Sequence, residues 1–415
     1  TITEIHDYLR LLYARVGTPY CPDHGLPLQA QSVSQMVDAV LGWPAETRLA
    51  VMAPIARARK GSFEDECASL QAQGYVRLRI DGQMQEISEM APLKKNEKHD
   101  IDVVIDRLRI RPESKQRLAE SFETAMQLAD EAMYQSGIVA VGDICNTADS
   151  ITVKQKSKLL YYNFIETMGI VEEGATQRYA QAEKLLVSFQ QSANRQFLGQ
   201  SIVPHAPYSV SQPLLDKIAE ATPQLWSIHW QESEAEMEFL QKGTGEFLKF
   251  YQKAGLPYNS ANNIRQFWSA PHFYQPLKKL NNKKGILVHN VEYNNNHIQA
   301  AQTDINFSNF YWCLCPSANQ YISNKLPSLS LMLEQKQHLV LGTDSLASND
   351  QLDIVAEMRI LKKAFPNLPL EVLLQAATIN GAHALQIAAQ FGSFETGKKP
   401  GFVLLEHDLS SSRIL

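Results

Sequence analysis

The stretch HLVLGTDSL (338–346) decides the fold of the larger part of this chain. It is a short apolar run that ends in a turn with a carboxylate, and similar runs precede it at regular intervals. These runs are GIVAVGDI (137–144), LLYYNFIET (159–167), QSIVPHAPYS (200–209), LWSIHWQES (225–233), GILVHNVE (285–292) and NFYWCLCPS (309–317). Because helical segments separate them, they predict buried parallel strands in an α/β fold. Seven strands of this kind are one short of a (β/α)8 barrel.

Histidine and carboxylate side chains, which can bind a metal or transfer protons, stand at the ends of these predicted strands. In a parallel barrel, catalytic groups lie at the C-terminal ends of the strands. His205, His229, His289 and Asp344 stand at four such ends, and Glu232 follows three residues after His229. One histidine at a strand end is more often a hydrogen-bonded structural residue. Several at near-successive ends predict a single site that binds a metal or a substrate.

The motifs PHAPYS, IHxxE, VHN, CPSAN, GTDSLASND and ATINGAHAL together resemble the metal-dependent amidohydrolase superfamily, in its cytosine-deaminase-like and chlorohydrolase-like branch. The resemblance covers about residues 131–408. It implies a TIM-like (β/α)8 barrel and a hydrolase that breaks a C–N or C–Cl bond of a small substrate, for example a heterocycle. A deaminase or a chlorohydrolase would both fit.

The resemblance also implies roles for the strand-end residues. His229 and Asp344 would bind one divalent metal ion, either zinc or iron, because imidazole and carboxylate suit such an ion. Asp344 would accept a proton from the attacking water, and Glu232 would shuttle protons as general acid and base. His289 would orient the water or stabilise the developing oxyanion.

Substrate contacts follow from the same resemblance. His205 would hold the substrate, and Ser317 and Asn319 of CPSAN would line the pocket. Three aromatic residues are compatible either with a flat ligand or with ordinary packing: Tyr208, Trp230 and Trp312.

One feature of the superfamily is missing. Its first barrel strand carries a His-x-His pair that supplies two metal ligands, but no two of the 11 histidines here stand two positions apart. The barrel is therefore predicted to lack its first strand. A lone imidazole and a lone carboxylate should bind metal weakly, so we expect impaired activity.

The amino-acid composition changes near residue 130. Residues 1–130 contain one Asn, 11 Arg and five Lys, whereas residues 131–415 contain 19 Asn, five Arg and 18 Lys. We predict a small α+β domain over 1–130, the barrel over 131–395, and a remnant of a small β-sandwich domain over 396–415. The chain then reads as a chimera, with the boundary inside a helix that crosses residue 130.

The first part has a resemblance of its own. TEIHDYLRLLYARVGTPYCPDHGLPLQAQSVSQMVD, MAPIARARKG, QGYVRLRIDG and KHDIDVVIDRLRI resemble UvrA, the ATPase subunit of nucleotide-excision repair, in the region that docks UvrB. No GxxxxGK[ST] loop occurs, so no ATP site is expected. The pair Cys21 and His24 is either a remnant of a zinc site or a loop coincidence. A basic cluster could meet acidic residues of UvrB or be a solvated face: Arg57, Arg59, Lys60, Arg77 and Arg79.

Composition limits the remaining possibilities. The formal net charge of −5 gives no footprint for direct binding of nucleic acid, and no apolar run is long enough to span a membrane. Five scattered cysteines indicate reduced thiols and a cytoplasmic location. Three readings stay open: an amidohydrolase with a small-molecule substrate, a UvrB-docking fragment, or a fusion in which neither activity is intact.

Overall fold

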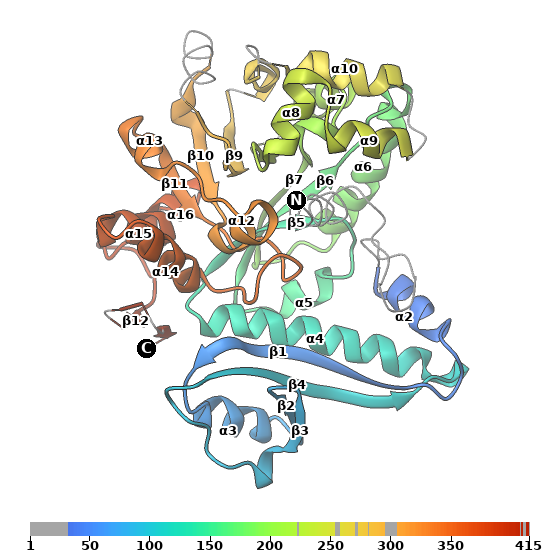
Figure 1. Cartoon of the computed structure of the whole chain (residues 1–415), viewed down its shortest axis with the longest axis vertical. Helices are drawn as coiled ribbons and strands as arrows, with labels where there is room; N and C mark the ends of the chain where they lie inside the picture. Colours follow the sequence, from blue (N-terminus) through green and yellow to red (C-terminus); the bar gives the residue numbers. More distant parts are fainter. Residues whose placement is uncertain are drawn as a thin grey trace.

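The computed structural model describes residues 32–221, 224–253, 258–269, 273–280, 282–294, 305–406, 408–409 and 412–414. An antiparallel sheet comes first in the chain, and parallel strands that alternate with helices follow it (Figure 1). The predicted α/β class is confirmed. Among the described residues, no helix is both long enough and apolar enough to cross a membrane. The pair Cys21 and His24 lies outside the described residues.

The antiparallel sheet has the strand order β1-β4-β2-β3. Its strands are β1 (Arg48–Lys60), β2 (Arg77–Ile80), β3 (Gln83–Glu86) and β4 (Lys98–Arg109), and the helices α2 (Val33–Leu41) and α3 (Glu64–Ala72) accompany them. Leu78 and Ile80 alternate along β2 and are buried with Val103 of β4, as expected for a sheet with one covered face. The sequence pattern predicts three of these strands but not β3, whose QMQE run is mostly polar.

The helix α4 (Lys115–Gln135) joins the two parts of the chain without a break. It lies between the antiparallel sheet and the parallel strands, packing against β1 and α2 on one side and against α5 (Ile151–Lys156) on the other (Figure 1). Leu118 is buried beside the antiparallel sheet, and Asp130 is buried near the parallel strands. The predicted domain boundary falls inside α4 and stays a prediction.

The parallel strands form two sheets with the orders β5-β6-β7 and β11-β10-β9-β8. The strands are β5 (Ala140–Cys145), β6 (Leu160–Thr167), β7 (Phe197–Pro204), β8 (Leu225–Trp230), β9 (Lys284–His289), β10 (Phe310–Leu314) and β11 (His338–Leu341). All seven runs predicted from the sequence form strands. The two sheets meet where the backbone N–H of His229 donates to the carbonyl oxygen of His205 at 2.8 Å.

The barrel is open on one side. β5 and β11 are the outer strands of the two sheets, and no strand within the described residues pairs with either on its outer side. In the order of a barrel, a strand preceding β5 would lie in this gap. The arrangement therefore agrees with the prediction of a barrel without its first strand.

Helices cover the outside of the parallel strands and connect them. They are α6 (Ala175–Gln191), α7 (Gln212–Glu220), α8 (Glu234–Lys242), α9 (Glu246–Lys253), α10 (Tyr258–Trp268), α12 (Pro316–Ser323), α13 (Leu329–Glu334), α14 (Ile354–Ala364), α15 (Leu370–Ala377) and α16 (Ile379–Ala384). Short 3-10 helices are η1 (Ile87–Glu89), η2 (Pro112–Ser114), η3 (Glu172–Gly174), η4 (Pro207–Ser209), η5 (Gln275–Leu280) and η6 (Phe307–Asn309). Near the C-terminus, β12 (Val403–Leu405) and β13 (Ser412–Ile414) form an antiparallel pair.

Aromatic side chains dominate the core around the parallel strands. Trp230 is fully buried against Trp268 and Phe273, with ring centroids 5.9 and 4.5 Å away. Trp312 and Tyr208 are equally enclosed. The alternative of ordinary packing, rather than a flat ligand, therefore applies to these rings.

Candidate metal and active site

Polar side chains from four neighbouring strands meet at the C-terminal edge of the parallel strands. Glu166 is the penultimate residue of β6, His205 directly follows β7, His229 lies in β8, and His289 ends β9. Their side chains are buried; those of Glu166 and His229 are 6% and 9% exposed. Parallel strands bring residues that are distant in sequence to one edge, and this edge is where barrel enzymes place their reactive groups.

His229 is at the centre of a row of polar contacts. Its Nε2 lies 3.2 Å from Oε1 of Glu166, and its Nδ1 lies 3.1 Å from Nε2 of His289. His289 in turn contacts the amide oxygen of Asn319 through Nδ1 at 2.9 Å, and Oε1 of Glu232 lies 3.4 Å from its Nε2. The backbone of His289 has φ +82°, a strained value that is found disproportionately at functional sites. The structure thus brings together four of the predicted site residues.

Glu166, His205 and His229 form a group that could hold a metal ion. One ligand atom from each lies within 4.8 Å of the others. Two imidazoles and one carboxylate are a donor set that zinc accepts, so these residues fit a divalent ion. Sequence reasoning missed Glu166, although a carboxylate at the end of LLYYNFIET stands at the same kind of strand end as the histidines.

Asp344 lies outside this donor group. It follows β11 with φ +55°, and its Oδ2 accepts a hydrogen bond from the Ser348 hydroxyl at 2.6 Å. Glu357 of α14 fixes the surrounding loop, since its carboxylate accepts from the Asn349 side chain at 2.7 Å and from the backbone N–H of Ser317 at 2.8 Å. Burial raises the pKa of Glu357 to about 7. The roles predicted for Asp344 and Ser317 stay predictions.

The turn after His229 is held by a second buried carboxylate. Glu236 of α8 accepts from the backbone N–H of Glu232 at 2.8 Å, and its own N–H donates to the Ser233 side chain at 3.2 Å. Burial raises the pKa of Glu236 to about 8. These contacts fix the backbone that carries Glu232 beside His289.

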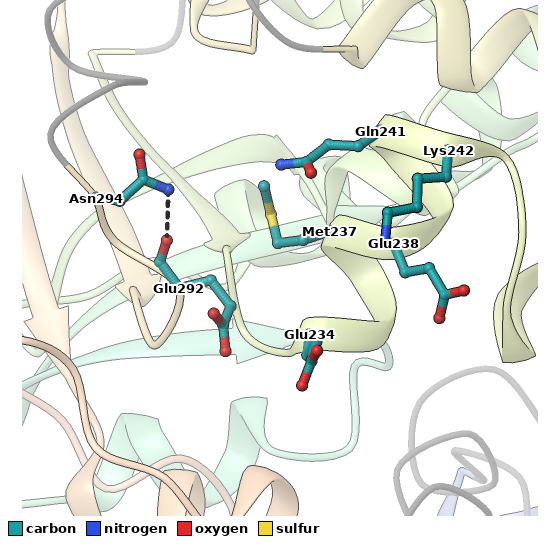
Figure 2. A pocket seen from close by; sticks show the side chains of 7 residues that line it. All are labelled: Glu234, Met237, Glu238, Gln241, Lys242, Glu292 and Asn294. Atoms are coloured by element: carbon teal, nitrogen blue, oxygen red, sulfur yellow. Dashed lines mark hydrogen bonds between the residues drawn. The ribbon is translucent and has the colours of Figure 1, made fainter.

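Two cavities lie away from this row of residues. One of about 460 Å³ lies beside α8, and Figure 2 shows its largely polar lining: Glu234, Met237, Glu238, Gln241, Lys242, Glu292 and Asn294. Another of about 540 Å³ is lined by Tyr162, Gly199 and Gln200, near the starts of β6 and β7. Neither contains His229 or His289, so we do not place the reaction there.

Two of the basic residues predicted to bind a partner are engaged within the antiparallel sheet. Arg79 donates to Oδ2 of Asp102 through Nε at 2.9 Å and through Nη2 at 2.7 Å. Arg57 bonds to the other oxygen of Asp102. Because Asp102 is buried, this pair of contacts stabilises the sheet, and a partner would have to compete with it.

The remaining basic residues are more accessible. Arg77 pairs with Glu86 across β2 and β3, and both side chains are 39% exposed. Lys60 is exposed, and the side chain of Arg59 lies outside the described residues. A docking role for this face stays a prediction.

Comparison with known families agrees with this geometry. The family model for the amidohydrolase family matches residues 112–413. The chain therefore belongs to the amidohydrolase family, a family of metal-dependent hydrolases. A second model, for the UvrA interaction domain, matches residues 31–136. Both matches include α4, so the chain joins the two families through this helix.

Curated relatives cover the first part of the chain. UvrABC system protein A of Neisseria meningitidis is 62% identical over 131 residues, which are 32% of this chain and 14% of that protein. The protein of the same name from Pseudomonas aeruginosa is 58% identical over 130 residues, 31% of this chain and 14% of that protein. The chain thus spans about one seventh of the length of these relatives.

Solved structures resemble the second part. Helicobacter pylori aminofutalosine deaminase aligns with a TM-score of 0.57 and 24% identity over 67% of this chain and 68% of that chain. An adenosine deaminase from Xanthomonas campestris with bound zinc aligns with a TM-score of 0.50 and 21% identity over 68% of this chain and 61% of that one. At these identities the likeness establishes the fold.

Proposed function

We propose that this chain is a hydrolase that uses one divalent metal ion, zinc or iron, to replace an amino group or a chloride on a small heterocyclic substrate. The observation that supports this proposal most is the meeting of Glu166, His205, His229 and His289 at the C-terminal strand ends. The solved structures it resembles include a deaminase with bound zinc and an aminofutalosine deaminase.

The side chains suggest how the reaction would be divided among them. A divalent ion, when bound, supplies Lewis acidity for an attacking water. Glu232, which is 3% exposed and faces His289, would carry a proton to the leaving group. Asn319 holds the His289 ring through Nδ1, and His289 would orient water or stabilise a developing oxyanion. Asp344 would take the first proton, and Ser317 would contact the substrate.

The test is a metal analysis coupled to a deamination assay on aminopurines and aminopyrimidines. We expect about one zinc or iron per chain in the purified protein, and His229→Ala should remove both the metal and any activity. His383→Ala, which changes an exposed histidine on α16, is the matched control and should change neither. A wild-type chain without metal and without activity in the presence of added zinc would refute the proposal.

A second candidate function is docking of UvrB by the antiparallel sheet. The match of residues 31–136 to the UvrA interaction domain favours it. Titration of the full chain against UvrB tests this, with Arg77→Glu expected to weaken binding because Arg77 is on the accessible face. Arg107→Glu, an exposed position of β4, serves as the charge-reversal control. Equal affinity of the wild type and Arg77→Glu would count against the basic face.

A further inference from the structure

Glu166 and His229 face each other across the strand ends. Oε1 of Glu166 lies 3.2 Å from Nε2 of His229, and both side chains are almost fully buried. The second oxygen of Glu166 accepts from the Asn146 side chain at 3.4 Å. A buried carboxylate is costly in free energy unless it is paired, so a proton or a cation is needed between Oε1 of Glu166 and Nε2 of His229.

The contacts behind His229 limit the ways in which its two nitrogens can share protons. The amide oxygen of Asn319 only accepts, so Nδ1 of His289 donates to it at 2.9 Å. Nε2 of His289 faces both Nδ1 of His229 at 3.1 Å and Oε1 of Glu232 at 3.4 Å. With a neutral His289, this nitrogen accepts from Nδ1 of His229. In this arrangement Nε2 of His229 directs a lone pair at the carboxylate of Glu166. Two acceptors 3.2 Å apart repel each other, and a cation bound by both removes that repulsion. A proton on Nε2 of His229, with His289 charged beside Glu232, is the arrangement without metal, and the metal titration below separates the two.

We propose that a divalent cation, best matched by zinc, binds Glu166, His205 and His229, and that Glu166 and His205 replace the ligands of the missing His-x-His strand. This inference rests on the proposed function, since it names the ligands of the same metal. Around a tetrahedral zinc with bonds of about 2.0–2.1 Å, neighbouring donors lie about 3.3–3.4 Å apart. The 3.2 Å between Glu166 and His229 matches that spacing, and the three donors lie within 4.8 Å of one another.

The surroundings support this ligand set. Nδ1 of His205 lies 2.6 Å from the Ser209 hydroxyl, so the hydroxyl fixes the ring and Nε2 would be its ligating atom. Two imidazoles and one carboxylate leave a fourth position for water, as catalytic zinc requires. Asp344 is tied to Ser348 and stays outside the group. The proposal therefore gives Asp344 only its predicted role as a proton acceptor.

The test is titration of the full metal-free chain with Co²⁺, followed by its visible absorption and by equilibrium dialysis. We expect one Co²⁺ per wild-type chain and an affinity at least about 10-fold lower in Glu166→Gln, because a ligand is lost. Glu173→Gln removes an exposed carboxylate of η3, is the matched control, and should bind like the wild type. Circular dichroism of each variant verifies folding.

X-ray absorption of the zinc-loaded wild type gives a measurement that needs no variant. Two imidazoles on the metal support the proposal, whereas a single imidazole overturns it. If Asp344→Asn loses the metal and Glu166→Gln keeps it, the inference is wrong while the proposed function stands. If the wild type binds no Co²⁺ at all, the proposed function fails together with the inference.

Discussion

Asp130 on α4 is the residue whose replacement tests how the two parts of the chain are joined. Its side chain is buried, and its Oδ1 accepts from the Ser157 hydroxyl at 2.7 Å and from the Tyr161 hydroxyl. Burial, followed by the hydrogen bond to Asp130, raises the pKa of Tyr161, so this phenol stays a donor. The carboxylate therefore fastens α4 to the start of β6.

Asp130→Ala should destabilise the parallel part of the chain by about 3–6 kcal/mol, because two hydrogen bonds to a charged group contribute about 1.5–3 kcal/mol each. Asp130→Asn keeps an acceptor and should lose about half as much. Urea denaturation followed by tryptophan fluorescence measures this, since Trp226, Trp230, Trp268 and Trp312 all lie in the parallel part. The midpoint of unfolding should fall with little change in slope.

Glu131 of the same helix provides the matched control. It pairs with Lys158 at 2.9 Å, but the two side chains are 37% and 56% exposed. An exposed ion pair contributes at most about 1 kcal/mol, so Glu131→Ala should be almost silent. If Asp130→Ala unfolds within about 0.5 kcal/mol of the wild type, the reasoning that α4 is anchored to the barrel through this carboxylate is refuted.

Three further predictions concern pH, metal and the open barrel. Burial raises the pKa of Glu357 from 4.5 to about 7, so the folded state binds this proton more tightly than the unfolded state does. The stability of the chain should therefore fall as pH rises from about 5 to about 7. Glu357→Gln should reduce the difference between the urea midpoints at these two pH values, and an unchanged difference would exclude Glu357 as its source. Zinc at a concentration 100 times its dissociation constant should raise the free energy of unfolding by about 2.7 kcal/mol, and a chelator should reverse this gain. If zinc stabilises His229→Ala by the same amount, the metal binds elsewhere. The open edges of β5 and β11 should favour association, so we expect oligomers or aggregates on sizing chromatography; a monomeric peak with one sharp melt would contradict this.

The sequence predicts the parallel strands well because each is a local apolar run between helical segments. It also predicts most of the strand-end residues, since a barrel brings such ends together. It misses β3 because QMQE carries no alternating apolar pattern. Glu166 is missed for another reason. It stands at the end of a predicted strand, as the histidines do, but only the fold shows that it lies 3.2 Å from His229.

The basic face shows the opposite failure. Arg57 and Arg79 form a cluster in the sequence that invites a partner, but Asp102 lies between them in the folded sheet and is buried. The spacing of residues in the sequence does not show that a charged side chain pairs with a residue of a neighbouring strand. Pairings across strands therefore have to be known before a charged cluster is assigned to docking.

The helix α4 explains how two unrelated families can share one chain. Both family matches include it, and its sequence has to satisfy two different neighbours. Leu118 packs under the antiparallel sheet, whereas Asp130 and Glu131 bond to residues before and within β6. A helix is stiff, so joining the parts through α4 fixes their relative position where a flexible linker would leave it open. Among the described residues the outer side of β5 is unpaired, at the place where a barrel has its first strand, and the proposed role of Glu166 follows from this gap.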